Sequence, residues 1–303
     1  MSPWEHRLFL PLEGIPLVQE KVTKPVVVSF GSSDLKWPLT RFSRQVRQSG
    51  HFSRLMLFSE ENLDPRFRSE FAHLLSPEVR GFGYWLWKPQ VIAQALEEVP
   101  DGTPVAYIDL GCHIVRDPRF EWAPLIALAK SSATSVVCFQ DDSRDPALKS
   151  GSLERAWTKR DTLEFFGVWE NADITETPQI AATSLFLVAS PESRRFVAEW
   201  LNLCSDNIPM LDDSPSAGAE SPFFVEHRFD QSVLSILTKL RGGTVLPLGL
   251  LYGVTVLLER GRTLALPWIA MRDKGGRVSS ALIGGREVMR RARRRLARYR
   301  FCS

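Results

Sequence analysis

The sequence has few cysteines and no apolar run long enough to cross a membrane. The four cysteines, at positions 112, 138, 204 and 302, have no metal-binding spacing such as C-x-x-C, which fits a reduced, cytosolic setting. The longest apolar stretch, 245–258, is broken by Pro247 and two glycines, whereas a membrane-spanning helix needs about 20 residues. The N-terminal residues MSPWEHRLFLPLEG lack the pattern of a signal peptide. We therefore expect a soluble or membrane-attached protein.

Familiar catalytic motifs are also missing. The chain has no Walker loop, no H-E-x-x-H, no G-x-S-x-G and no Cys/His zinc spacing, so none of the enzyme classes with those signatures is indicated. It also has no internal repeat and no low-complexity linker. Of its 303 residues, 44% are hydrophobic and 24% are charged, which is the composition of an ordinary globular protein with a sizeable core.

Positive charge is concentrated near the C-terminus. The net charge is only +3, yet residues 286–300 contain eight arginines and one acid. Apolar residues recur there at near-helical spacing, which predicts a short basic amphipathic helix that anionic lipid headgroups would attract. A solvated charge run and a nucleic-acid tail are the alternatives. Nothing else in the chain has a nucleic-acid-reading signature, so we expect no nucleic-acid partner.

Short apolar runs alternate with helical patterns through most of the chain. This alternation predicts an α/β fold: one mixed, mostly parallel sheet flanked by helices, in a single domain spanning residues 25–270, between a lead-in segment (1–24) and the basic tail (271–303). A segment rich in Ser, Pro, Asp and Gly, 205–222, is expected to be a mobile loop. The expected strands are 25–31, 55–58, 104–109, 135–140, 183–189 and 244–248, and the expected helices 39–50, 89–99, 191–203 and 228–240.

Polar residues that follow the strands are the first candidates for a site, because ligands of open α/β sheets bind at the carboxyl ends of strands. These candidates are 31–33, 109–113 and the pair Asp141 and Asp142. Asp109 has two interpretations of similar weight. It could hold a cation or a ribose hydroxyl, or it could cap a turn in which Gly111 supplies a positive φ.

Three further polar segments have both a functional and a structural interpretation. Lys88 lies at a helix start, where a cation beside helix N–H groups suits a phosphate, but it could also be a surface lysine next to an aromatic core. The segment 226–231 opens a helix, and Asp230 could be only a charge at its N-terminus. The segment 157–161 is similarly polar and could be a solvated helix start.

Taken together, these segments resemble a known family. In order they are strand-F-G-S, G-F-G-Y-W-L-W-K-P, Y-I-D-L-G-C, W-T-K-R-D, T-P-Q-I-A-A and E-H-R-F-D-Q-S. This order resembles bacterial GT-A-type glycosyltransferases of capsule, O-antigen and related polysaccharide loci. The resemblance covers residues 25–240 and is most specific at 81–89 and 226–232. It is more distantly similar to glycogenin-like and lipooligosaccharide galactosyltransferases, which share a late Asp-Gln pair.

The resemblance implies a role for each matching residue. The catalytic pair beside the transferred sugar would be Asp230 and Gln231. The end of the first strand, the lysine near the diphosphate and the D-x-D element would bind the donor. One aromatic and three polar residues would line the sugar or acceptor side. In this sequence the donor-binding residues are Phe30, Gly31, Ser32, Lys88, Asp109 and Gly111, and the sugar or acceptor residues Trp87, Arg160, Asp161 and Gln179.

The same resemblance implies Mn²⁺ or Mg²⁺, bound through Asp109. The sequence departs from the family at the second acid of D-x-D, which is Gly111. A single carboxylate holds such ions less firmly, because they bind through oxygen ligands and substrate phosphates. A histidine would then complete the site, either His227 or His113.

The function that follows is transfer of a sugar from a nucleoside diphosphate sugar to a glycan or lipid-linked acceptor in surface polysaccharide synthesis. The Asp-Gln pair favours retention of configuration, with Gln231 beside the oxocarbenium-like sugar; an inverting enzyme would use Asp230 or Asp161 as base. The expected location is cytoplasmic, with the basic tail on the inner face of the cytoplasmic membrane. The alternatives are a degenerate, non-catalytic nucleotide-sugar-binding protein and a sugar nucleotidyltransferase.

Overall fold

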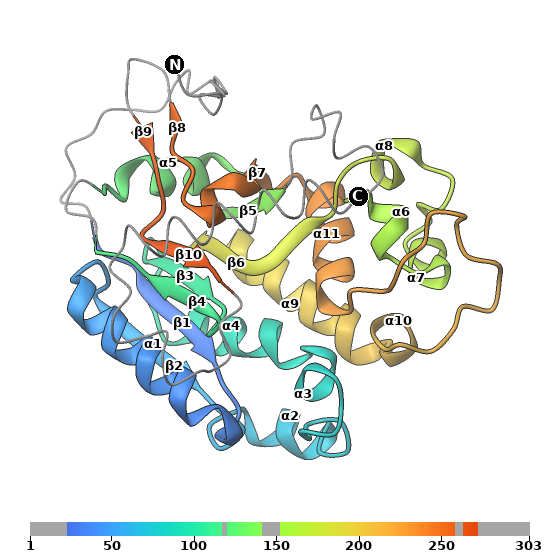
Figure 1. Cartoon of the computed structure of the whole chain (residues 1–303), viewed down its shortest axis with the longest axis horizontal. Coiled ribbons are helices and arrows are strands. Elements are labelled where there is room, and N and C mark those ends of the chain that lie inside the picture. Colours follow the sequence, from blue (N-terminus) through green and yellow to red (C-terminus); the bar gives the residue numbers. More distant parts are fainter. Residues whose placement is uncertain (1–22, 117–119, 141–151, 258–262, 272–303) are drawn as a thin grey trace.

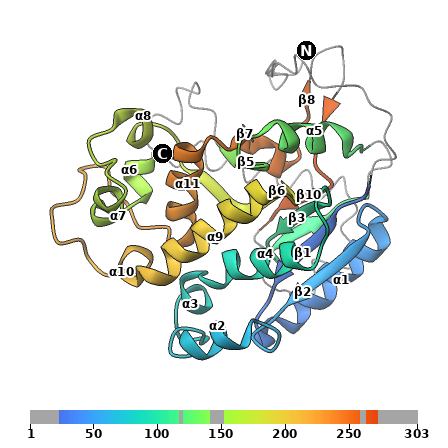
Figure 2. The ribbon, with the colours of Figure 1, turned by 180° about the vertical axis from the view of Figure 1, so that it is seen from behind.

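The computed structural model shows a central sheet with helices on both faces (Figures 1 and 2). It describes residues 23–116, 120–140, 152–257 and 263–271. The basic helix predicted in 286–300, most of the lead-in segment and the pair Asp141 and Asp142 lie outside these residues. None of the described helices is both long and apolar enough to cross a membrane.

Six strands form the main sheet in the order β2-β1-β3-β6-β5-β7. All of them run in the same direction except β6, which is antiparallel to both of its neighbours. The mixed, mostly parallel sheet predicted from the sequence is therefore confirmed. The strands are β1 (Val26–Phe30), β2 (Arg54–Phe58), β3 (Pro104–Ile108), β5 (Val136–Gln140), β6 (Ile180–Val188) and β7 (Thr244–Pro247).

The sheet is buried on both faces, as its nearly continuous apolar strands require. Alternate residues of each strand point to opposite sides and enter two separate cores. The first core contains α4 (Trp87–Glu97), α9 (Pro191–Asp206) and α11 (Asp230–Arg241). The second contains α1 (Lys36–Ser49) and α5 (Ala123–Ser131). The result is a three-layer arrangement of helices, sheet and helices.

Shorter elements fill the edges of this framework. Two small antiparallel pairs flank the second core, and several single-turn helices lie between the main elements. The small strands are β4 (Cys112–Ile114) with β10 (Trp268–Ala270), and β8 (Val256–Leu257) with β9 (Thr263–Leu264). The short helices are η1 (Ser33–Leu35), α2 (Pro65–Glu70), α3 (Gly81–Tyr84), α6 (Glu154–Trp157), α7 (Arg160–Phe165), α8 (Ala172–Thr175), α10 (Ile208–Leu211) and η3 (Leu248–Tyr252).

The reversed direction of β6 matters for function. Because β6 is antiparallel to β3, its beginning lies at the edge of the sheet where β1 and β3 end. The Asp109 N–H donates to the Thr183 carbonyl across this edge, at 2.9 Å. The helices α4 and α11 begin near the same edge. Five segments that are far apart in the sequence therefore meet there.

Two local predictions need correction. Gly111 does not have a positive φ, although the Cys112 N–H does close a turn onto the Asp109 carbonyl at 2.9 Å. The segment 205–222, expected as a mobile loop, contains α10 and is tied to α7. The helix-ending role of Gly50 is confirmed, since Gly50 follows α1 in the left-handed conformation with φ +67°.

Stability should depend on the centre of the sheet. Phe186 in β6 is fully buried and stacks on Trp122, with ring centroids 5.7 Å apart. Phe186→Ala should lower the free energy of unfolding by about 3–5 kcal/mol, because the lost contacts leave a cavity. The matched control is Phe165→Ala, a half-exposed residue whose truncation should cost less than about 0.5 kcal/mol. Urea denaturation followed by circular dichroism measures both, and equal losses would contradict the assignment of the core.

Candidate functional site

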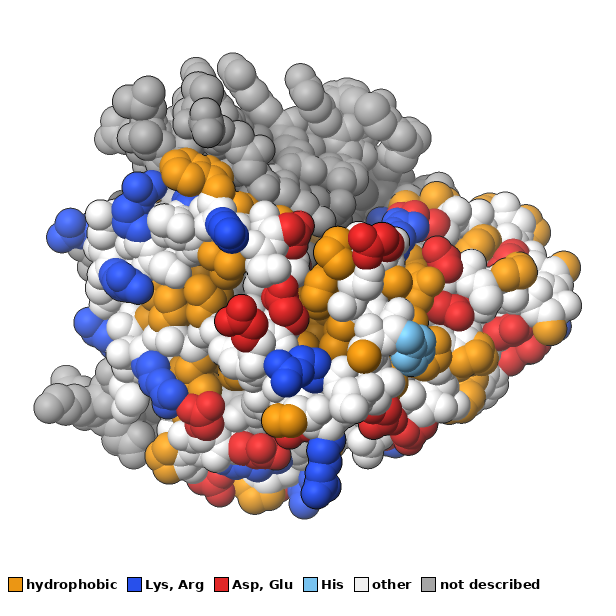
Figure 3. Space-filling model, turned by 90° about the horizontal axis from the view of Figure 1, so that it is seen from below, with side chains coloured by type: hydrophobic (Ala, Val, Ile, Leu, Met, Phe, Trp, Pro, Cys, Tyr) orange, Lys and Arg blue, Asp and Glu red, His pale blue; other side chains and the backbone are white. Residues whose placement is uncertain are grey.

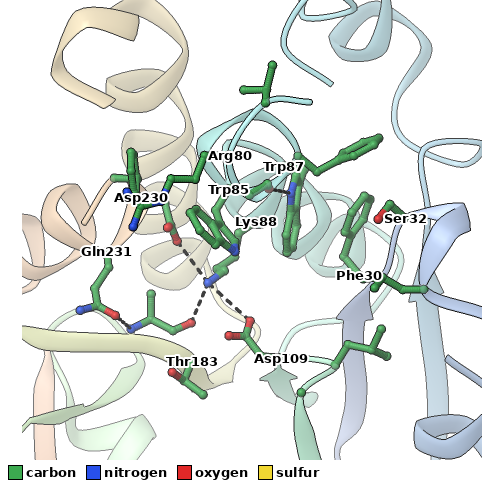
Figure 4. A pocket seen from close by; sticks show the side chains of 18 of the residues that line it. Phe30, Ser32, Arg80, Trp85, Trp87, Lys88, Asp109, Thr183, Asp230 and Gln231 are labelled. Atoms are coloured by element: carbon green, nitrogen blue, oxygen red, sulfur yellow. Dashed lines mark hydrogen bonds and ion pairs between the residues drawn. The ribbon is translucent and has the colours of Figure 1, made fainter. Parts of the chain in front are cut away.

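A cavity of about 740 Å³ opens where these five segments meet (Figure 4). Its size is that of a small-molecule or cofactor site. It is lined by the ends of β1 and β3, the beginnings of β6, α4 and α11, and the segment 77–85. Of the residues predicted from the sequence, it brings together Phe30, Ser32, Trp87, Lys88, Asp109, Gly111, Asp230 and Gln231.

At the centre of the cavity a lysine ammonium lies between two carboxylates. The Lys88 Nζ is 3.4 Å from Asp109 Oδ1 and 3.2 Å from Asp230 Oδ2, and it donates to the Ala182 carbonyl at 3.0 Å. Lys88 and Asp230 are each only 3% exposed. Lys88 is therefore not a surface lysine, which was the structural interpretation of its position in the sequence. A buried charge of this kind is stable only when it is paired.

Burial and charged neighbours set the protonation of Asp230. Burial raises the pKa of Asp230 most, the Lys88 ammonium lowers it and nearby Asp109 raises it, and together these effects place it at about 7. Burial alone would lower the pKa of Lys88, but Asp109 and Asp230 together outweigh it and hold the pKa above its usual value. The Tyr107 hydroxyl donates to Asp109 Oδ1 at 2.6 Å. Burial raises the pKa of Tyr107, and the Asp109 carboxylate raises it further. The Lys88 ammonium therefore pairs with two carboxyl groups, of which that of Asp230 takes up a proton near neutral pH.

The amide of Gln231 is held in a fixed orientation. Its Oε1 accepts from the Ala182 N–H at 3.2 Å, and its Nε2 donates to Gln179 Oε1 at 2.6 Å. Gln179 is not among the residues that line the cavity. Its own Nε2 is bonded within a buried network, to Glu154 Oε1, the Trp157 carbonyl, Thr158 Oγ1 and Ser232 Oγ. Gln179 therefore lies behind Gln231 and orients it.

One wall of the cavity is aromatic. Phe30 and Trp87 stack with ring centroids 4.1 Å apart and planes inclined by 21°, and Phe82 lies 5.9 Å from Phe30. Ser32 and the backbone of Gly31 lie beside this wall, where a Cβ on Gly31 would come within 2.7 Å of Leu110. Figure 4 shows the wall on the opposite side of Lys88 from Gln231. An elongated ligand could therefore contact aromatic rings at one end and the amide at the other.

The segment Gly81–Trp85 forms a left-handed turn at the mouth of the cavity. Its five residues have φ values of +66°, +58°, +95°, +53° and +61° in order. Left-handed backbone costs about 1–2 kcal/mol at each non-glycine residue. Gly81 has no room for any other residue, since a Cβ would lie 2.3 Å from the Trp85 ring. Strain of this kind is typical of functional segments and must be offset by surrounding contacts.

Those contacts converge on Phe229, the residue before Asp230. Tyr84 and Trp85 pack on the Phe229 ring with centroids 5.4 and 5.5 Å away, and the Arg80 guanidinium lies 4.7 Å above it. Phe229 itself has a strained backbone, with φ +53° and ψ −129°. The aromatic motif at 81–89 and the E-H-R-F-D-Q motif are thus directly packed together, and this packing places Asp230.

Arg160 and Asp161, like Gln179, are predicted sugar or acceptor residues that do not line the cavity. The carboxylate of Asp161 accepts from the Ala217 N–H at 3.1 and 3.0 Å, and the Arg160 side chain donates to the Ala219 carbonyl at 3.2 Å. The neighbouring Lys159 is 2% exposed and bonds Asp212 and Ser214. The segment 157–161 therefore anchors the loop 212–220. Its Lys159 is buried, which a solvated helix start, the alternative interpretation, does not explain.

The histidines proposed as metal ligands have other partners. His227 Nδ1 accepts from the Lys159 N–H at 3.3 Å, and its Nε2 lies 3.0 Å from the Met210 carbonyl. Burial lowers the pKa of His227 to about 3, so the ring is neutral, with Nε2–H as donor. His113 is buried in β4, with Nδ1 3.1 Å from Gln45 Nε2. Within the described residues no three His, Cys, Asp or Glu side chains form a cluster that could hold a metal ion.

The sequence analysis missed two arginines of the cavity lining, Arg80 and Arg228. Arg80 pairs with Glu226 at 3.0 Å, and the Arg228 guanidinium lies 3.4 Å from the centre of the Trp157 ring. Arg80 directly precedes the motif 81–89 and Arg228 lies within the motif 226–232, so position relative to the motifs was the signal that the sequence offered. On the face seen in Figure 3, acidic and basic side chains are intermixed.

Comparison with known proteins gives remote structural likeness only. No family model and no curated protein matches the sequence. Similar solved structures include the galactosyltransferase LgtC with donor and acceptor sugar analogues, which is 12% identical, with a TM-score of 0.35 over 73% of this chain and 72% of that one. Core-mannan synthase A from Aspergillus fumigatus, in an Mn/GDP form, is 11% identical, with a TM-score of 0.39 over 82% and 81%.

A third similar structure is mouse xyloside xylosyltransferase 1 in its apo form. It is 10% identical, with a TM-score of 0.39 over 75% of this chain and 85% of that one. All three are sugar-transferring or glycan-synthesising proteins by name. A structural likeness with TM-scores this low does not indicate an activity.

The raised pKa of Asp230 should be visible in stability. The folded state binds this proton more tightly than the unfolded chain, in which an Asp has a pKa of about 3.9. The stabilisation is complete below about pH 4 and is lost as the pH rises to about 7. The free energy of unfolding of the wild type, relative to Asp230→Asn, should therefore fall by a few kcal/mol between about pH 4 and about pH 8.

Urea denaturation at a series of pH values measures this difference. Asp173→Asn, at an exposed position at the start of α8, supplies a matched surface control. A wild-type-to-Asp230→Asn difference that stays constant across the pH range would show that the Asp230 pKa is not raised.

Proposed function

We propose that the chain is a glycosyltransferase that moves a sugar from a nucleoside diphosphate sugar to a glycan or lipid-linked acceptor. The observation that carries this proposal is the order of groups along one cavity: the aromatic wall, then Lys88 with Asp109, then Asp230 with the clamped Gln231. A nucleoside diphosphate sugar needs the same order, with a ring stack for the base, a cation near the diphosphate and polar groups around the sugar.

The chemistry follows from the side chains. The bond between the anomeric carbon and the diphosphate oxygen breaks, and the electron pair leaves with the diphosphate. The Gln231 Oε1 has a second lone pair beyond its bond to the Ala182 N–H, with which it stabilises the positive charge that develops on the sugar. The acceptor hydroxyl oxygen then bonds the carbon from the same face, and its proton passes to the departing diphosphate. Configuration is thereby retained.

The proposed setting is surface polysaccharide synthesis, as the sequence resemblance implies. The basic segment 286–300 would hold the protein to anionic headgroups on the cytoplasmic side of the membrane, next to a lipid-linked acceptor. A sugar nucleotidyltransferase is less well supported, because such enzymes carry a glycine-rich basic loop after the first strand. Here the segment after β1 has a single glycine, Gly31.

Nucleotide binding is the first test. One of the common nucleoside diphosphates, supplied at 100 times its dissociation constant, should add about 2.7 kcal/mol to the stability of the wild type and raise its melting temperature. Phe30→Leu should weaken that binding by about 1–3 kcal/mol, since the ring stack is lost. Thermal-shift titration measures both effects. A well-folded protein that responds to no nucleoside diphosphate would rule out the proposed function.

Transfer itself should depend on the orientation of Gln231. Gln231→Leu should lower kcat by about 100-fold or more while leaving nucleotide binding intact, as expected for a group that acts on developing charge. Gln179→Met keeps the volume but removes the acceptor for Gln231 Nε2, so kcat should fall by about 10-fold with KM unchanged.

Donor hydrolysis and transfer assays measure the two rates, and NMR of the product establishes its anomeric configuration. An unchanged kcat in Gln231→Leu would remove Gln231 from the mechanism. An inverted product would instead assign the base role to Asp230. Full nucleotide binding without any transfer or hydrolysis in the wild type would favour the degenerate, non-catalytic alternative.

A further inference from the structure

A cation belonging to the chain already occupies the space between the two carboxylates of the cavity. Lys88 Nζ has three N–H groups and three oxygen partners: Asp109 Oδ1, Asp230 Oδ2 and the Ala182 carbonyl. The longest of the three distances is 3.4 Å. Carboxylate and carbonyl oxygens are also the ligands that Mg²⁺ and Mn²⁺ prefer. The ammonium therefore lies where oxygen ligands from three strand and helix ends converge.

The remaining candidates for a divalent site do not add ligands to this point. Gly111 replaces the second acid of the D-x-D element and supplies no side-chain oxygen. Both nitrogens of His227 lie within hydrogen-bond distance of backbone groups outside the cavity. Asp109 Oδ1 is shared between Lys88 and the Tyr107 hydroxyl. A divalent ion would have to displace the Lys88 ammonium to reach both carboxylates.

We propose that Lys88 takes the position of the divalent cation, and that the chain binds its nucleotide and transfers the sugar without Mg²⁺ or Mn²⁺. This inference rests on the proposed glycosyl transfer, and it departs from the metal that the sequence resemblance implies. The ammonium keeps its proton throughout and offsets the charge that develops on the departing diphosphate.

The fixed position of Lys88 suits this role. A preorganised cation inside a partly closed site stabilises developing charge without reorganising during the reaction. The backbone carbonyl of Ala182 and the two carboxylates hold the ammonium from three directions. Lys88 itself is a buried residue of α4. Arg80 and Arg228 add positive charge to the same cavity. Together these three residues supply the cationic groups of the described cavity lining.

The direct test is Mn²⁺ binding to the full chain, read by electron paramagnetic resonance and by thermal shift. Metal-stripped wild type should leave added Mn²⁺ free. Lys88→Ala should bind Mn²⁺ in the space that the ammonium leaves between the carboxylates of Asp109 and Asp230. Lys239→Ala is the matched control. It removes another ammonium from a partly buried ion pair, 2.7 Å from Glu154 Oε2, at a position with a single carboxylate, so it should not gain Mn²⁺.

The second arm measures function in the wild type alone, which avoids any folding defect of the variants. The nucleotide dissociation constant and the transfer rate should differ by less than about twofold between EDTA and Mn²⁺. Tenfold tighter nucleotide binding with Mn²⁺, transfer abolished by EDTA, or Mn²⁺ bound by the wild type would overturn the proposal. So would a folded Lys88→Ala that binds no Mn²⁺.

The two proposals fail in different ways. A wild type that binds no nucleotide with or without Mn²⁺ contradicts the glycosyltransferase function, while the Mn²⁺-binding comparison of Lys88→Ala with Lys239→Ala still tests the position of the ammonium. If Lys88→Ala unfolds in EDTA and folds in Mn²⁺, the metal has replaced the lost cation, which supports the proposal.

Discussion

The pairing of one buried ammonium with two carboxylates is the constraint around which this site is built. Burying an unpaired lysine would cost several kcal/mol, so the ends of β3, β6 and α11 must reach Lys88 together. Each partner is fixed in turn: Asp109 by the Tyr107 hydroxyl, and the beginning of β6 by hydrogen bonds to Gln231 and Asp109. The cavity is therefore a consequence of satisfying a charge, and its shape follows from the partners that this charge requires.

A second constraint is the strained backbone of Phe229, directly before Asp230, and of the turn that packs on it. The left-handed turn Gly81–Trp85 and the outlier Phe229 are each unfavourable alone. Their aromatic rings pack on each other, so the hydrophobic contact that stabilises one also holds the other. This explains why two aromatic segments that are distant in sequence carry the most specific motifs. They form one unit that fixes where α11 begins and where its first carboxylate points.

Much of the framework could be predicted from the sequence, because apolar runs and helix-ending signals such as Gly50 are local. The resemblance placed Lys88, Asp109 and Asp230 in one site, and in the structure the three side chains are neighbours. The local pattern alone left Lys88 as a surface residue, as lysines usually are. The direction of β6 and the left-handed turn could not be predicted, since both depend on packing between distant segments. His227 and Asp161 look functional by residue type, yet their polar groups are used by nearby backbone.

The assembly of the cavity from distant segments also bears on when the site forms during folding. Lys88 precedes Ala182 by 94 residues, and Asp230 lies farther along the chain again. Contacts of such long sequence separation are slow to close, because the entropy of a long loop is lost before they form. No fragment that lacks α11 can hold the ammonium between its two acids. The site is thus complete only when α11, the last long helix of the described residues, has packed against the sheet.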